Sequence, residues 1–403
     1  MSPEAWKKNL YVIFVAELIV IMGFSFVTPF LPLYIQQAGN FSDKDAAFWS
    51  GIAGSAAGIS MFLSSPIWGI LADRMGRKPM VLRAMFGGGI VIAITGLVHN
   101  IYGIIALRFL QGLLSGTVAA ASALVAASTP RDKLAYAMGL LMVAVYGGNA
   151  VGPLIGGVIA EKAGFTAAFL ITGGILCIGG LIVTMLVAED FVPPAKAETT
   201  SIGGMLRLAK SREILPILGV TLALNAGPAI LSPILPLYIQ ELNPLGSAET
   251  ASGMAFFLMG LVATGSSFVA GRLGQRYSLK KILIVSCIGS ALLYLPPMLA
   301  SNSTQLLIFI AAMGLLRGGM ISSSSTFIAL VAPATQQGIA YGVNQSASSL
   351  GGAIGPLIGG AVAPLLGFKM VFAVTACVFF LSGILVWRLI AGVDTGKPAI
   401  AAR

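Results

Sequence analysis

The sequence is short of charged side chains, cysteine and histidine, and each shortage excludes a class of protein. Charged residues make up 9% of the chain, against about 25% in soluble globular proteins, while 57% of the residues are hydrophobic. Cys177, Cys287 and Cys377 lie singly in apolar runs, so we expect neither disulfides nor a cysteine metal site. One histidine leaves little for acid–base chemistry, and no phosphate-binding glycine loop with its lysine occurs. We therefore expect no enzyme, no catalytic residue, no metal and no cofactor.

What the chain has instead is a series of long apolar runs. About 20 apolar residues cross a bilayer, so 403 residues leave room for roughly a dozen spans and no sizeable water-soluble domain. We predict helices at 10–36, 48–70, 79–99, 102–127, 135–160, 165–187, 213–241, 251–271, 280–300, 304–330, 339–363 and 368–391. The predicted fold class is an all-α polytopic protein in a lipid bilayer.

The basic residues predict the orientation of these spans. Nineteen of the 24 lysines and arginines fall on one side of the predicted membrane, and Lys44, Lys162 and Lys369 fall on the other. Basic loops face the cytoplasm, so we expect both termini and the central loop there, in a multi-pass protein of a bacterial inner membrane. His99 is expected at the surface, near the outer end of the third span. The net charge of +10 then reflects membrane-facing loops and does not indicate nucleic acid.

An internal repeat divides the chain. Residues 151–157, Val-Gly-Pro-Leu-Ile-Gly-Gly, recur at 354–360 with a single change, and the segment 28–36 recurs at 232–240. The widest polar gap lies between the copies. We expect an N-terminal six-helix half at 1–187, a cytoplasmic linker at 188–212 and a C-terminal half at 213–403. Duplicated halves enclose a path and alternate by rocking, which favours a transporter over a purely structural duplication.

An ordered pattern of glycines, an acid and bases occupies the loop between the second and third predicted spans. It reads Gly-Ile-Leu-Ala-Asp-Arg-Met-Gly-Arg-Lys-Pro at 69–79. The glycines permit a tight turn, and Asp73 can accept hydrogen bonds from basic groups. A plain basic turn explains the bases but not the order. A degraded copy occupies 271–281, with Gln275 where the acid would stand.

The fifth predicted span is rich in glycine. Glycines four residues apart let helices pack closely in lipid, and a proline in a spanning helix favours a bend. Ordinary small-residue packing is the alternative interpretation. The residues concerned are Gly148, Gly152, Pro153, Gly156 and Gly157.

These motifs resemble those of the major facilitator superfamily. The loop at 69–79 is similar to its signature loop, and the glycines of the fifth span are similar to the motif of its drug/proton antiporters. The segment 107–112, Leu-Arg-Phe-Leu-Gln-Gly, resembles an arginine motif linked there to proton coupling. The segments 30–34, 49–51 and 71–78 look most like the MdtG-type multidrug exporters.

The resemblance implies a fold and a set of roles. The fold is the major facilitator fold, with twelve transmembrane helices in two pseudo-symmetric six-helix bundles. In the family, the acid of the signature loop latches the cytoplasmic side in the outward-facing state. Here that acid is Asp73, with Arg77 as its expected partner. The residues of the implied latch are Gly69, Asp73, Arg74, Gly76 and Arg77.

Three charged residues lie well inside predicted spans, where a charge costs about 2.5–3.5 kcal/mol. Desolvation disfavours an ionised carboxylate, so Glu17 can take up a proton on one side and release it when its surroundings change. We expect Glu17 to couple transport to protons, with Arg108 as its electrostatic partner. A static ion pair, or an acid wetted at the cytoplasmic surface, is the alternative. Arg317 either binds backbone carbonyls or faces an anionic substrate.

The substrate site is expected on the first, fourth, seventh and tenth spans, which line the central path throughout the family. Methionine and aromatic side chains adapt to varied ligands, although they also fill ordinary helix interfaces. The candidates are Met22, Phe26, Asn225, Met313 and Arg317.

The sequence thus predicts a monomeric, proton-coupled exporter of small amphiphilic compounds or drugs. Its partners would be a small-molecule substrate and protons. One alternative is a dedicated exporter or importer of a single metabolite, such as a sugar or a lipid-like compound. Another is a membrane receptor or scaffold that transports nothing. The antiporter-type glycines favour export, and the buried charges favour transport over a scaffold.

Overall fold

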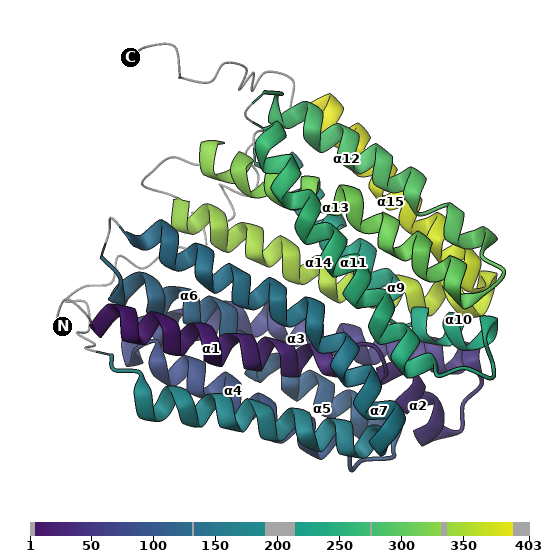
Figure 1. The fold of residues 1–403 in the computed structure, drawn as a ribbon, viewed down its shortest axis with the longest axis horizontal. Coiled ribbons are helices and arrows are strands. Elements are labelled where there is room, and N and C mark those ends of the chain that lie inside the picture. Colours follow the sequence, from purple (N-terminus) through teal and green to yellow (C-terminus); the bar gives the residue numbers. More distant parts are fainter. Residues whose placement is uncertain (1–4, 131–132, 190–213, 275, 332–336, 390–403) are drawn as a thin grey trace.

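A computed structural model describes residues 5–130, 133–189, 214–274, 276–331 and 337–389. Within these ranges every regular element is a helix, which confirms the all-α class. The helices lie roughly side by side in one elongated bundle (Figure 1). All three cysteines are free.

The first half of the chain forms the lower part of the bundle in Figure 1. Its helices are α1 (Ala5–Phe26), α2 (Leu31–Gly39), α3 (Asp43–Met75), α4 (Lys78–Thr95), α5 (Ile101–Leu114), α6 (Thr117–Ser128) and α7 (Leu134–Leu186). The second half forms the upper part. Its elements are α9 (Leu215–Leu231), α10 (Leu235–Leu242), α11 (Ala248–Leu273), α12 (Leu279–Leu293), the 3-10 helix η2 (Pro296–Leu299), α13 (Ser303–Val331), α14 (Gln337–Leu366) and α15 (Phe368–Leu389).

The described helices account for twelve membrane crossings. Ten helical stretches are long and apolar enough to span a bilayer. One of them, in α7, holds two spans that meet at Gly164, where φ is +82° and the helix bends. The twelfth crossing is made by α5 and α6 together.

Several helices that we expected to be continuous are interrupted. The first span bends between α1 and α2 at Pro29, and the seventh bends between α9 and α10 at Pro233, because proline cannot donate the backbone hydrogen bond that a straight helix needs. The fourth span, predicted as 102–127, breaks at Ser115 and Gly116, where Gly116 has φ +110°. The ninth ends earlier than predicted, at Leu293, and η2 follows.

The repeated segments of the two halves pack in corresponding ways. The Tyr34 hydroxyl donates to the carbonyl oxygen of Val98 at 2.7 Å, and the Tyr238 hydroxyl donates to that of Pro297 at 3.3 Å. Each tyrosine thereby fastens the end of its half's first span to the end of the third. Each half also has its own hydrophobic core. The domain boundaries stay a prediction, since 190–212 of the linker lie outside the described residues.

The two ends of the bundle carry different elements. α2 and α10 lie at one end, at the right of Figure 1, and α1 begins and α15 ends at the other. Following the predicted orientation, we name the end with α2 and α10 the outer end and the opposite one the inner end.

Candidate functional site between the two halves

The glycines of α7 lie directly against α1. A Cβ atom built on Gly148 would stand 2.9 Å from the backbone nitrogen of Met22, and one on Gly152 would stand 2.5 Å from the Met22 carbonyl oxygen. Gly156 meets the backbone of Phe26 in the same way. Any side chain at these positions would force the two helices apart. The glycine motif therefore serves close packing on α1, the helix that carries Glu17.

Two further glycines bring the halves together at the outer end. Gly157 of α7 lies against the backbone of Glu249 and Thr250 at the start of α11. Its counterpart in the second repeat, Gly360 of α14, lies against Ala47 and Gly51 at the start of α3. We call these two contacts the outer seams. They are related by the internal repeat, and each needs a glycine because backbone meets backbone.

The halves separate toward the inner end. Gly139 and Val143 continue the seam face of α7 at helical spacing, yet a Cβ on Gly139 would meet nothing within 4 Å and Val143 is 59% exposed. On α11, Gly271 likewise has open space around it and Phe268 is 64% exposed. The interface is thus closed at the outer end and open at the inner end.

Glu17 lies on α1 and is completely buried against the start of α6. Neither carboxyl oxygen has a hydrogen-bond partner among the described residues. The Thr117 hydroxyl is its polar neighbour, without a well-formed hydrogen bond. The alternative of an acid wetted at the cytoplasmic surface does not fit this position.

Arg108 does not pair with Glu17 in this structure. Its Nη1 donates to Gln111 Oε1 at 2.7 Å, one helical turn away on α5, and its Nε is buried without a partner among the described residues. The alternative of a static ion pair is therefore not met by Arg108. Their joint role in proton coupling stays a prediction.

The second half places neutral groups where the first half has Glu17. The repeat offset makes Thr221 of α9 the counterpart of Glu17. The Thr221 hydroxyl donates to Asn344 Oδ1 at 2.7 Å and lies 2.9 Å from Ser324 Oγ. Asn225, one of the substrate candidates, donates to the Thr221 carbonyl oxygen at 2.8 Å. This cluster is neutral and hydrogen-bonded, whereas Glu17 is ionisable and unpartnered.

Arg317 of α13 lies between tyrosines of both halves. The groups that act on its charge are Tyr294, from its own half, and Tyr146 of α7, from the other half. Its Nε is buried without a hydrogen-bond partner among the described residues. Tyr146 is 46% exposed and lies on the side of α7 that opens toward the inner end. Among the described residues, Arg317 is thus a cation at the interface with no carboxylate acting on its charge.

The other substrate candidates differ in accessibility. Phe26 and Met313 are each 1% exposed and fill helix packing. Met22 is partly exposed, close to Gly148 and Gly152. Of the substrate candidates, Met22, Asn225 and Arg317 keep some exposed surface.

Comparison with known proteins shows which family and which relatives this chain resembles. A family model described as Major Facilitator Superfamily matches residues 13–244 and 217–402. The chain is 35% identical over 396 residues to "Multidrug resistance protein MdtG" of Escherichia fergusonii, covering 96% of this chain and 97% of the relative. The protein of that name from Salmonella typhimurium is 35% identical over 388 residues, with 96% of each chain covered.

The chain belongs to the major facilitator superfamily.

It is accordingly a multi-pass membrane transporter. Among solved structures, a bacterial homologue of the human lysosomal transporter Spinster, in an inward-facing and occupied conformation, shares the fold. Its TM-score is 0.79 at 12% identity, over 96% of this chain and 97% of that one. At this identity the likeness concerns the fold alone.

The signature loop of the superfamily is described in part. The surroundings of Gly69 and the side chains of Asp73 and Arg74 lie outside the described residues, so the latch stays a prediction. Gly76 ends α3 with φ +93°, a conformation that favours glycine. The backbone nitrogens of Arg77 and Lys78 both donate to the Glu189 carboxylate at 2.8 Å.

Glu189 was missed as a structural residue because it falls in the polar stretch that reads as a linker. Its carboxylate lies at the start of α4, where the free amides and the helix dipole favour a negative charge. Lys78 completes the connection, since its Nζ donates to the carbonyl oxygens of Thr184 and Val187 at 2.9 and 2.7 Å. The loop is thereby fastened to the end of α7, within its own half.

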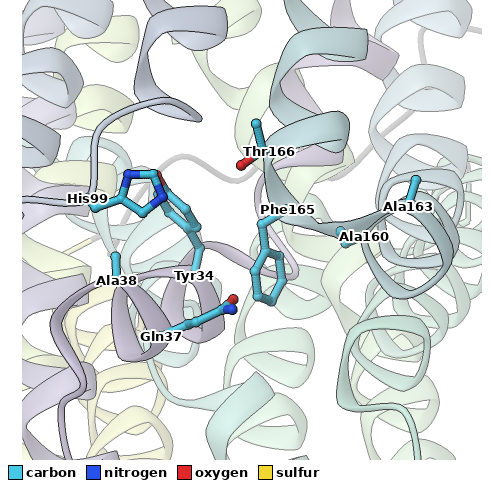
Figure 2. A pocket seen from close by; sticks show the side chains of 9 residues that line it. Tyr34, Gln37, Ala38, His99, Ala160, Ala163, Phe165 and Thr166 are labelled. Carbon is cyan, nitrogen blue, oxygen red and sulfur yellow. The ribbon is translucent and has the colours of Figure 1, made fainter.

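A pocket of about 480 Å³ lies apart from the interface, at the outer end. Figure 2 shows Tyr34, Gln37 and His99 across from Phe165 and Thr166. All of its lining residues belong to the first half, so it does not lie on a path between the halves. His99 is exposed there, in keeping with its expected place at the surface.

Proposed function

We propose that this chain is a monomeric, proton-coupled exporter of small amphiphilic compounds in a bacterial inner membrane. The two halves alternate by rocking at the interface where the fifth span of each half meets the second span of the other. Protons enter as substrate leaves. The MdtG relatives, whose names state multidrug resistance, support export of more than one compound.

The observation that carries this proposal is the state of Glu17. It is a completely buried carboxyl group without a hydrogen-bond partner among the described residues. A permanent charge in such a place would be costly, so the group is suited to exist in a protonated and an ionised form. The glycine-packed α7 lies against the same helix, so a shift of α1 is transmitted directly to the outer seam at Gly157.

The closed outer seams and the open inner end support one step of the transport cycle, the uptake of a compound from the cytoplasm. With the outer seams closed and the inner end open, the interface accepts a compound from the cytoplasm. Export then requires the outer seams to part and the inner end to close. Each seam is a short backbone contact between glycine-rich helices, which can separate without unfolding a helix.

Arg317 supports a preference within the substrate class. A partly buried guanidinium without a carboxylate partner among the described residues is stabilised by a ligand that brings a negative charge or several acceptor oxygens. The tyrosines beside it, one from each half, add aromatic surface for the apolar part of an amphiphile. We therefore propose that anionic amphiphiles are among the compounds carried.

A growth-inhibition panel in a pump-deficient strain tests the function. Expression should protect against several unrelated amphiphiles, and a protonophore at a sublethal dose should abolish that protection. Glu17→Gln, checked for equal membrane expression, should protect against none. Protection against a single compound would favour a dedicated exporter, and protection that survives the protonophore would contradict proton coupling.

A further inference from the structure

The break in the fourth span has a defined geometry. α5 ends at Leu114, and α6 begins at Thr117. Ser115 is extended and Gly116 has φ +110°, a region that side chains other than glycine rarely enter. The residues at 115–118, Ser-Gly-Thr-Val, are weak helix formers, and side-chain contacts from neighbouring spans add to this local tendency to break.

Two side chains from the neighbouring spans donate hydrogen bonds to backbone carbonyl oxygens on the α5 side of the break. Trp68 Nε1, on α3, donates to the Leu113 carbonyl oxygen at 2.7 Å. Arg83 Nη2, on α4, donates to the Ser115 carbonyl oxygen at 2.9 Å. The Arg83 guanidinium also stacks over the Trp68 ring, 3.7 Å from its centre. These donors satisfy carbonyl groups that a continuous helix would pair with its own next turn.

The amide side of the break faces Glu17. The first residues of a helix have backbone N–H groups without an intrahelical partner, and no described side chain caps this end of α6. Glu17, completely buried and without a hydrogen-bond partner among the described residues, has its carboxyl group beside Thr117, the first residue of α6. The unpartnered carboxyl group thus lies beside the start of α6, where the positive end of the helix dipole favours the ionised carboxylate.

The second half lacks this arrangement. α13, the counterpart of α5 and α6, runs unbroken from Ser303 to Val331. Thr221, the counterpart of Glu17, is satisfied by neutral partners. The break therefore occurs in the half with the buried acid and is absent from the half without it.

We propose that Trp68, Arg83 and Gly116 are positioning residues for proton coupling, holding the fourth span broken so that the positive end of α6 lies beside Glu17. This inference rests on the proposed function, since it concerns the same proton site. It also connects Glu17 with the signature loop, because Trp68 and Arg83 lie just before and just after that loop. A change in the ionisation of Glu17 alters how firmly α6 is held, and the break transmits this to α3 and α4.

The other ionisable groups on the helices around Glu17 do not account for stabilisation of its ionised form. α1 packs against α6 and α7. α6 contains no ionisable side chain. On the first span of α7, Tyr136 contacts Tyr11 and Tyr146 faces Arg317. Arg108 of α5 is bonded to Gln111.

The test measures substrate-induced proton release from the purified, full-length protein as a function of pH. The probe is an amphiphile that the growth panel identifies as exported. Gly116→Ala disfavours the left-handed turn without changing any charge. Arg83→Lys keeps the charge but loses the planar donor that reaches Ser115. Both should raise the pH at half-maximal release by about half to one unit, the size of a helix-terminus effect, because the carboxylate loses the favourable dipole at the start of α6.

Matched variants separate this proposal from the function on which it rests. Gly174→Ala, at a helical glycine with open space around it, should leave the midpoint unchanged. Glu17→Gln should abolish release, and release that persists would overturn the proposed function itself. If Glu17→Gln abolishes release while Gly116→Ala and Arg83→Lys keep the wild-type midpoint, only the positioning role is wrong. Should Gly116→Ala fail to fold, Trp68→Phe, which removes one donor, decides in its place by the same criterion.

Discussion

At the residue scale, the buried charges of the described spans are held in two different ways. Arg83 and Arg108 each donate a hydrogen bond within the first half. Glu17 has no such partner there, and Arg317 has only tyrosines beside it. The groups without firm partners are the ones that a proton and a substrate can engage, because binding then removes the cost of an unpaired buried charge.

Arg317 carries a prediction about ligand charge. Arg317→Gln should weaken binding of a carboxylate amphiphile by about 10- to 150-fold, since a charge-assisted hydrogen bond contributes about 1.5–3 kcal/mol. Binding of the methyl ester of the same compound should change little. Isothermal titration calorimetry on the purified protein measures both. Equal losses for acid and ester would show that Arg317 serves packing, and Arg388→Gln, near the end of α15, is the control.

These residues differ in how far the sequence could identify them. Glu17 and Arg317 stand out because each is a charge inside a long apolar run. Arg83 does not, because it lies close to the basic loop, in the second turn of α4, and counts with the basic residues of the cytoplasmic side. Its contact with Ser115 joins residues 32 apart in sequence, a tertiary relation that no local pattern shows.

At the element scale, glycine content was a reliable guide to helix packing. The four-residue spacing in α7 predicted close packing, and the backbone contacts with α1 confirm it. The break in the fourth span was not predictable in this way. A single Gly116 in a small-residue helix is compatible with an unbroken span, and the break requires donors from α3 and α4.

The outer seams carry a prediction about conformation. Gly157→Leu should open the seam, because its side chain has no room against Glu249 and Thr250. Overpacking of about 1–3 kcal/mol would shift the populations several-fold or more toward the outward-open state. Spin labels at the exposed positions Lys162 and Leu245 report this as a longer distance. Gly174→Leu, with open space around it, should leave the distance unchanged, and an unchanged distance in Gly157→Leu would contradict the seam assignment.

A polar contact beside this seam carries a prediction about pH. Glu161, in the junction between the two spans of α7, accepts a hydrogen bond from the Thr250 hydroxyl of the other half. Hydroxyl donors from Thr250 and then Ser247 hold the pKa of Glu161 below its ordinary value of 4.5. The ionised form therefore stabilises the closed seam above that value, and this stabilisation is lost as pH falls through the lowered pKa.

The same pair of labels tests the contact. The distance should lengthen in the wild type on acidification from above pH 4.5 through the lowered pKa of Glu161, and Glu161→Gln should remove this acid-dependent step. Glu241→Gln, an exposed acid on α10, is the matched control and should behave as the wild type. An acid step that persists in Glu161→Gln would assign it to another group.

At the scale of the whole molecule, the repeat explains both the symmetry and its exceptions. Two halves from duplicated sequence give two outer seams, two fastened tyrosines and two glycine-packed helix pairs. Apolar runs and the repeat offset were sufficient to predict this architecture. The halves differ at two places. Glu17 of the first half corresponds to Thr221 of the second, and the broken fourth span corresponds to the continuous α13. We therefore place proton handling in the first half, with Arg317 as the contribution of the second half to substrate binding.

The proposed function depends on the exchange of a proton for substrate at Glu17. The most direct measurement is proton release from the purified protein in weakly buffered solution, followed with a pH dye as an exported amphiphile is added. The wild type should release protons in a saturable manner, and Glu17→Gln should bind the amphiphile and release none. Release of equal size from both proteins would contradict the claim.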